Sequence, residues 1–180
     1  RSHSLVGYAT VRPVESVALG GQIGWLRPSV LSRAGWFQGD SLDTPRVFPS
    51  NPVFAFTDQP TFIQREVSVT ADTRDFPRHP SSGGLYRAAA ATFTDAMDVF
   101  SFTRYEAEVA QFVPLAGSRF VLAARGWLVA SDTDLDQTVP FYLQPSLGGE
   151  NTLRSYPDYR FHDRNMLVVN AEARIVLTAH

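Results

Sequence analysis

The chain has 180 residues, a formal net charge of -2 at pH 7, 44% hydrophobic residues and no cysteine. Its length fits one domain, and the lack of cysteine excludes a disulfide framework and any thiolate metal site. The 16 basic residues are all arginine and are interspersed with the 18 acidic residues, so nucleic acid is not an expected partner.

If the chain crosses a membrane, it must do so with strands. No stretch contains the roughly 18 uncharged apolar residues that a membrane helix requires, and the first residues lack a signal-peptide pattern. Apolar and polar residues instead alternate in about seven segments of about ten residues, separated by turn-forming residues, which predicts antiparallel strands.

The predicted strands are 4–12, 17–26, 62–72, 85–94, 99–113, 119–131 and 165–178. The first two form a hairpin across a short turn at 13–16. The fifth contains a slip in its alternation near Thr103, which predicts a β-bulge. The last alternates most clearly, with Val169 and Ile175 on its apolar face and Glu172 on its polar face.

The predicted connections differ in length along the chain. They are short at 13–16, long at 27–61, shorter at 73–84 and 114–118, and long again at 132–164, while the short connection 95–98 breaks the alternation. Short turns on one rim and long loops on the other are typical of outer-membrane barrels, in which the long loops are extracellular. We therefore expect 27–61 and 132–164 to be extracellular loops.

The two faces of the predicted strands favour a membrane barrel over a soluble one. Charged residues stand in the middle of the polar faces, which suits a wet lumen, and the apolar faces contain many small residues, which lipid tolerates better than a packed core does. We predict Glu66, Glu108 and Glu172 on the lumen face, and Val67, Val109, Val169 and Ile175 on the lipid face. A soluble β-barrel binding module stays open as an alternative, because its strands would alternate as well.

Three segments carry motifs. The first is Asp72-Thr73-Arg74-Asp75-Phe76-Pro77 followed by Pro80-Ser81-Ser82-Gly83-Gly84, the second is Phe112-Val113-Pro114-Leu115, and the third is Leu147-Gly148-Gly149-Glu150-Asn151-Thr152-Leu153-Arg154-Ser155-Tyr156. In this order they resemble the D-x-R-D…P-x-x-G periplasmic turn, the y-x-P-l turn and the G-G-x-x-x-(V/L)-R-G-(F/Y) tip of the sixth extracellular loop in the BamA/TamA (bacterial surface antigen) family of Gram-negative bacteria.

The resemblance implies an all-β fold, an antiparallel transmembrane β-barrel of sixteen strands in the outer membrane. Because seven strands cannot close into a barrel in lipid, we expect residues 1–180 to supply about seven of these sixteen strands as part of one barrel domain. We expect no POTRA domain within these residues. The implied function is insertion, assembly or translocation of outer-membrane proteins. The implied partners are the lipid bilayer, unfolded outer-membrane proteins and periplasmic or lipoprotein components.

The resemblance also implies a site. In the family the loop tip folds back into the lumen and its arginine pairs with an acidic residue of the wall; the matching residues here are Gly148, Gly149, Leu153, Arg154, Ser155 and Tyr156. A guanidinium in a narrow lumen requires a carboxylate in bidentate geometry, and Glu172 on the next strand is the first candidate. A partner outside this chain is the alternative, because the family's following motif, an aromatic strand ending in aspartate and glycine, is absent.

Ser155 replaces the family's glycine after the arginine. The matching turn residues are Asp72, Arg74, Asp75, Pro77, Gly83 and Gly84.

No catalytic residue, metal site or cofactor is expected. Asp132, Asp134 and Asp136 have the spacing of the first ligands in a calcium loop, but the required glycine and final glutamate are missing. His162-Asp163 has no serine elbow or cysteine nucleophile to serve. The alternative functions are a passive pore and the membrane anchor of a fused soluble domain.

Overall fold

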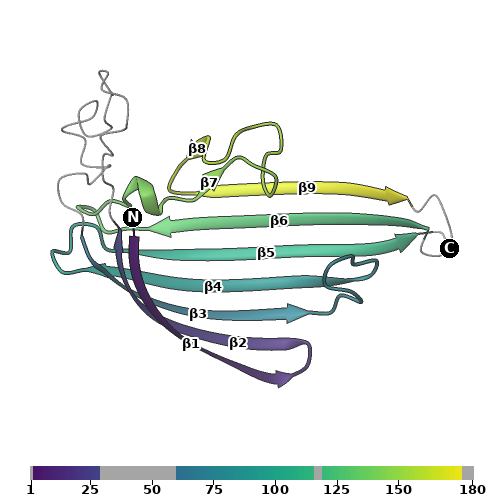
Figure 1. Ribbon diagram of the computed structural model, residues 1–180, viewed down its shortest axis with the longest axis horizontal. Coiled ribbons are helices and arrows are strands. Elements are labelled where there is room, and N and C mark those ends of the chain that lie inside the picture. The colour runs from purple at the N-terminus through teal and green to yellow at the C-terminus, as the bar shows by residue number, and fades with distance from the viewer. Residues whose placement is uncertain (1, 29–59, 116–118, 176–180) are drawn as a thin grey trace, which may run out of the picture.

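The computed structural model describes residues 2–28, 60–115 and 119–175. Seven strands form one antiparallel sheet in the order β1-β2-β3-β4-β5-β6-β9 (Figure 1). Their bounds are Ser2–Val14 (β1), Val17–Pro28 (β2), Phe62–Asp72 (β3), Gly83–Asp95 (β4), Phe102–Leu115 (β5), Phe120–Asp132 (β6) and Met166–Ile175 (β9). The 3-10 helix η2 (Phe141–Leu143) and the short hairpin of β7 (Ser146–Leu147) and β8 (Phe161–His162) lie between β6 and β9.

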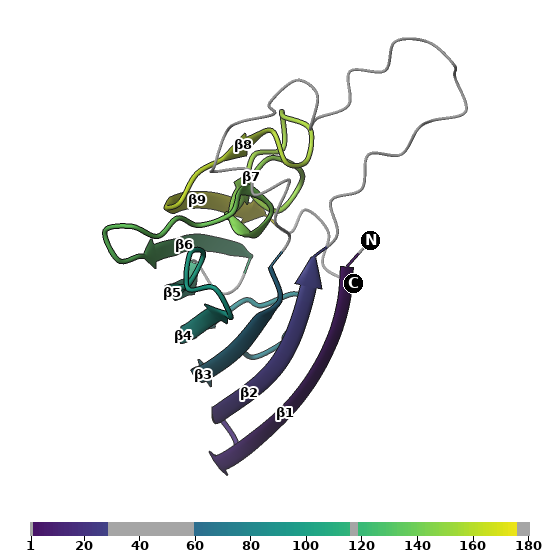
Figure 2. The same ribbon diagram turned by 90° about the vertical axis from the view of Figure 1, so that its left-hand side faces the viewer.

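The sheet is a curved wall, and the segment 133–165 lies on its concave side beside β6 and β9 (Figure 2). Each strand pairs with its sequence neighbour in the sheet, and within the described strands β1 and β9 form the two open edges. The fold is therefore part of an antiparallel barrel wall, as the alternation predicts. None of the described residues forms a helix that is long and apolar enough to cross a membrane.

The predicted strands agree with the observed ones except at their ends, and the two long predicted loops lie between the expected strands. Most of the predicted loop 27–61, namely 29–59, falls outside the described residues, as do 116–118 of the predicted turn 114–118 and 176–178 of the predicted strand 165–178. The predicted loop 132–164 contains η2 and the β7–β8 hairpin, which the sequence pattern does not indicate.

The β-bulge predicted near Thr103 is wrong. Strand β5 begins at Phe102 and keeps a continuous register with β4 and β6. The slip in alternation instead marks a turn, in which the buried Asp95 carboxylate accepts hydrogen bonds from the amides of Val99 (3.4 Å) and Phe100 (3.1 Å). An irregularity does occur in β1, between Val11 and Val14.

Residues that lie opposite one another in an antiparallel sheet share a face, so the register assigns every strand residue to one of two faces. We call the face toward the segment 133–165 the inward face; it carries Glu66, Glu108 and Glu172, as predicted. The outward face carries the exposed apolar side chains Val67, Val109, Val169 and Ile175. Alternation along each strand thus separates charge from apolar surface across the wall.

The inward face is less polar than expected at one end. We call the end at which β3 begins and β4 ends the loop rim, and the opposite end the turn rim. Near the loop rim a buried apolar cluster occupies the inward face; its members are Phe62, Ala91, Phe93, Phe100, Phe102 and Val139. Because Val139 and the adjoining Leu143 come from the segment 133–165, hydrophobic burial holds this segment against the wall.

Candidate functional site

The segment 147–156, which we call the loop tip, folds tightly on itself before it meets the wall. Gly148 has φ 138° and Gly149 has φ 77°, a region that favours glycine. A Cβ atom on Gly148 would lie 2.0 Å from the carbonyl oxygen of Pro157. The buried Thr152 hydroxyl closes the turn, since it donates to the Gly148 carbonyl (2.6 Å) and accepts from the Gly148 amide (2.8 Å).

Ser155 fits its position without backbone strain. The Tyr156 amide donates to the Leu153 carbonyl (3.0 Å), and the Gly149 amide donates to the Tyr156 carbonyl (2.9 Å). The non-glycine residues with positive φ in the described ranges are Asp98 and Tyr159. Serine therefore replaces the family's glycine at a position that does not need a left-handed backbone here.

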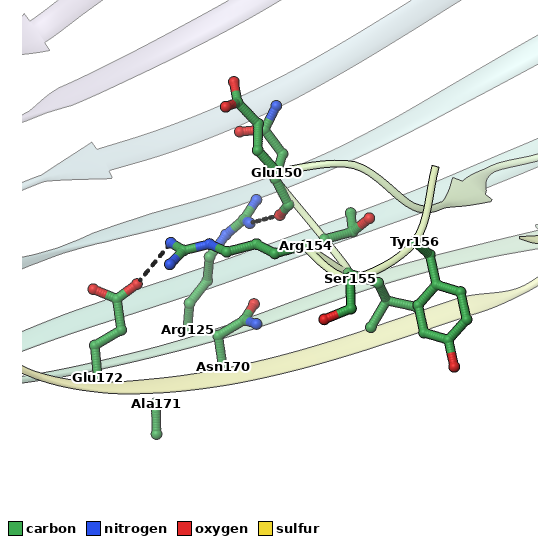
Figure 3. Close-up of a pocket in the computed structure, with 11 residues that line it drawn as sticks. Arg125, Glu150, Arg154, Ser155, Tyr156, Asn170, Ala171 and Glu172 are labelled. Atoms are coloured by element: carbon green, nitrogen blue, oxygen red, sulfur yellow. Dashed lines mark hydrogen bonds and ion pairs between the residues drawn. The ribbon is translucent and has the colours of Figure 1, made fainter. Parts of the chain in front are cut away.

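Arg154 and Glu172 lie together on the inward side of β9 (Figure 3). The Arg154 Nη2 atom is 3.2 Å from the Glu172 Oε1 atom. The contact is a single one, in contrast to the bidentate geometry expected of a narrow lumen, and the side chains are 76% and 41% exposed. An ion pair this exposed contributes about 0–1 kcal/mol to stability.

Glu172 also joins the loop tip to the turn rim. Its Oε2 atom accepts from Arg174 Nε (3.2 Å) and Nη2 (3.1 Å). Arg174 Nη1 in turn donates to the Pro80 carbonyl (3.5 Å), in the turn between β3 and β4. A chain of polar contacts thus runs from Arg154 across β9 to the segment 73–82.

Arg125 on β6 makes the firmest contact between wall and tip, and the sequence analysis did not single it out. Its Nε atom donates to Glu108 Oε1 (2.7 Å), and its Nη1 atom donates to the carbonyl of Asn151 (3.0 Å). The guanidinium lies 5.1 Å from the ring centroid of Trp127. The available signal was an arginine in the middle of the predicted strand 119–131, and the observed register places it on the same face as Glu108.

Between the loop tip and the strands β6 and β9 is a cavity of about 460 Å³. Figure 3 shows that Arg125, Glu150, Arg154 and Glu172 line it. Further along the inward face, Arg87 pairs with Glu66 (3.4 Å) and Glu106 (3.3 Å). The cavity is therefore one end of a ladder of opposite charges that extends from β3 to β9.

Segment 133–165 has a second attachment near the loop rim, at Arg104 of β5. Its Nη2 atom donates to the carbonyl of Leu143, and its guanidinium carbon lies 5.3 Å from the ring centroids of both Phe93 and Phe102. No carboxylate of the described residues pairs with Arg104 within 4.0 Å. The neighbouring Tyr142, also part of this attachment, has its pKa raised to about 12 by burial.

The predicted turn residues gather in one compact turn at the turn rim. Arg74 binds the Asp72 carboxylate through two atoms, Nε at 2.8 Å and Nη2 at 2.7 Å, and donates through Nη1 to the Pro77 carbonyl (3.1 Å). This pairing raises the pKa of Arg74. Gly83 has φ 86°, and a Cβ atom on it would lie 2.0 Å from the Thr73 carbonyl oxygen.

Asp75 and Gly84 complete this turn. Asp75 Oδ1 accepts from the amides of Ser81 (2.9 Å), Ser82 (3.2 Å) and Phe76 (2.9 Å), and these hydrogen bonds, that of Ser81 first, lower the Asp75 pKa. The Gly84 carbonyl accepts from the Thr73 amide (2.8 Å). The structure thus brings the turn residues together in one group and the loop-tip residues in another.

Comparisons with known proteins match this architecture. The sequence profile described as "Omp85 superfamily domain" matches residues 55–179. Among 26 matching chains of solved structures is "The crystal structure of BamA from Haemophilus ducreyi lacking POTRA domains 1-3", with a TM-score of 0.64 and 16% sequence identity. The match covers 88% of this chain and 30% of that one, so the present chain spans about a third of its length. No curated protein matches significantly.

Proposed function

We propose that this chain, which belongs to the Omp85 superfamily, forms part of the wall of an outer-membrane barrel that inserts or translocates other outer-membrane proteins. In this proposal the outward face contacts lipid and the inward face lines the lumen. The loop rim faces the outside of the cell and the turn 73–82 faces the periplasm. The proposed role is mechanical and requires no catalytic residue.

One observation supports this proposal most strongly, the seating of the loop tip on the charged inward face. Arg125 donates to a backbone carbonyl of the tip, Arg154 reaches Glu172, and apolar packing near the loop rim holds the same segment. The polar contacts of the tip are individually weak, about 0–1 kcal/mol for an exposed ion pair, so an arriving chain can displace the tip while the buried apolar packing holds the rest of the segment.

The proposal also explains the chain of contacts through Glu172. A segment on the external side and a turn on the periplasmic side both reach one carboxylate, through Arg154 and Arg174. If the tip moves when a substrate strand arrives, Glu172 loses its contact with Arg154 and keeps only Arg174. The contact of Arg174 with the Pro80 carbonyl in the turn then changes as well. We propose that this pairing links the two rims.

The test is an insertion assay with the full-length protein in vesicles and a urea-unfolded outer-membrane barrel as substrate. We expect the wild type to accelerate folding of the substrate, measured by its heat-sensitive migration in gels, and Arg125→Ala to reduce the acceleration more than Arg154→Lys does. A steady ion conductance without any acceleration would instead support the passive pore or membrane anchor. Recovery of the protein in solution without detergent would support the soluble binding module.

A further inference from the structure

A groove crosses the outward face of β1 to β4, on the side of the wall away from the charged ladder. It has a volume of about 730 Å³. Four small residues form its floor: Gly7, Ala9, Gly21 and Ala90. The larger side chains of Ile23 and Val67 stand beside it, both largely exposed. The groove is therefore an apolar hollow in a surface that is otherwise covered by protruding side chains.

The small residues leave the hollow open. A Cβ atom on Gly21 would meet no heavy atom within 4 Å. A second groove of about 500 Å³ shares Val67 and Ala90 with the first and continues over β4 to Tyr105. Together the two grooves offer an extended apolar track that a flexible hydrocarbon chain can follow.

Arg65 lies at the end of the groove nearer the loop rim. It is exposed on the outward face and makes no hydrogen bond or ion pair with any residue in the described parts of the chain. Three arginines of the inward face differ from it, since Arg87, Arg125 and Arg154 each pair with a glutamate. Arg65 is thus a cation without a carboxylate on an apolar face, which complements an anionic group from outside the protein.

Along the strands, the register places Arg65 nearer to the loop rim than the deeper part of the groove floor. Arg65 lies opposite Ile23 and Thr92, whereas the groove floor at Gly21 and Ala90 lies opposite Val67, two residues further along β3. Arg65 is three residues from Phe62, so it is about 10 Å from the loop rim, and the part of the floor at Gly21 and Ala90 is about 7 Å deeper. This is the order of headgroup and hydrocarbon in one leaflet of a bilayer.

We infer that Arg65 and the groove below it bind a phosphate-headed lipid, with the phosphate on the guanidinium of Arg65 and an acyl chain on the floor formed by Gly7, Ala9, Gly21 and Ala90. The planar fork of arginine matches phosphate oxygens. Thr92, which lies opposite Arg65 in the register and also lines the groove, carries a hydroxyl that can serve as a further donor. The inference rests on the proposed membrane placement and adds a ligand to the lipid-facing side.

Native mass spectrometry of the full-length protein in detergent tests this site. The probes are phosphatidylglycerol and a diacylglycerol with the same acyl chains, which lacks the phosphate. Arg65→Gln removes the cation, and Gly21→Leu fills the groove. Arg27→Gln and Gly126→Leu are the matched controls, because Arg27 lies outside the groove and Gly126 is a second outward glycine with no heavy atom within 4 Å of an added Cβ.

We expect the wild type to retain phosphatidylglycerol about tenfold better than diacylglycerol, the size of one charge-assisted hydrogen bond. Arg65→Gln should lose this preference, Gly21→Leu should lower retention of both lipids, and both controls should behave as the wild type. Excess inorganic phosphate should not displace the lipid. Equal preference in the wild type and Arg65→Gln, or full displacement by inorganic phosphate, would overturn the inference.

A separate vesicle-flotation measurement distinguishes this inference from the proposed function. Wild-type protein that floats with vesicles but shows no lipid preference contradicts the lipid site alone. Protein that fails to float contradicts both the membrane placement and the lipid site.

Discussion

Arginine side chains make many of the polar contacts on the inward face, and these contacts differ in length and in exposure to solvent. Arg125 has a 2.7 Å contact with Glu108, and its side chain is 31% exposed, whereas Arg154 has one 3.2 Å contact and is 76% exposed. A charge-assisted hydrogen bond contributes about 1.5–3 kcal/mol and an exposed pair about 0–1 kcal/mol. The two arginines should therefore differ when removed.

The first prediction compares these two arginines. Arg125→Ala should lower the free energy of unfolding by about 2 kcal/mol, and Arg154→Ala by about 0.5 kcal/mol, measured by urea unfolding of the protein in vesicles. A double-mutant cycle of Arg154→Ala with Glu172→Gln should give a coupling of about 0.2–1 kcal/mol. Strictly additive losses at Arg154 and Glu172 would move the functional partner of Arg154 to a residue outside this chain.

The second prediction concerns Asp75, whose pKa is lowered by amide donors, chiefly that of Ser81. A carboxylate with a depressed pKa stabilises the turn fully above its ordinary pKa of about 3.9, and this stabilisation is lost as the pH falls through the lower value of the folded state. Hydrogen exchange at the Ser81 and Ser82 amides should therefore keep constant protection factors above about pH 5 and lose protection below about pH 4. Asp75→Asn should remove the pH dependence, and a loss of protection near neutral pH would contradict this account.

Among the elements, the strands were predictable and the loop contacts were not. Alternation is a local property, so it placed the strand β3 at 62–72 and assigned Glu66 to the inward face. Arg104 and Phe93 show what alternation cannot predict. Their positions in the alternating pattern give the face of the sheet on which they lie, but not which segment of the chain covers that face. The covering residues Val139 and Leu143 are distant in sequence and have no periodic pattern. Family resemblance located Arg154, and alternation placed Glu172 on the inward face of the next strand. The contact of Arg125 with Asn151 depends instead on the position of the tip against the wall, which no local pattern indicates.

The third prediction tests the fold of the loop tip. Gly148→Ala should open the tip, because a Cβ atom there would lie 2.0 Å from the Pro157 carbonyl oxygen and φ is 138°. Trypsin should then cleave after Arg154 and Arg160 faster than in the wild type. Gly126→Ala is the matched control, since its added Cβ atom meets nothing within 4 Å. Equal cleavage rates in both variants would show that the tip does not depend on this glycine.

At the scale of the whole molecule, the two faces of the wall should differ in their tolerance of charge. Val169→Arg should cost about 2–4 kcal/mol if the outward face contacts the middle of a bilayer, whereas Asn170→Arg on the inward face should cost little. Refolding into vesicles, followed by urea unfolding, measures both. Equal costs at the two neighbouring positions would favour a soluble fold over a membrane barrel.

Cysteine labelling tests the central claim, a wall between lipid and lumen, most directly, and the chain has no native cysteine to interfere. Single cysteines at Val67, Val109 and Val169 should be shielded from a water-soluble maleimide in the intact membrane, while those at Glu66, Glu108 and Asn170 should react. The three pairs are sequence neighbours on opposite faces of β3, β5 and β9. Equal reactivity within each pair would contradict the barrel wall.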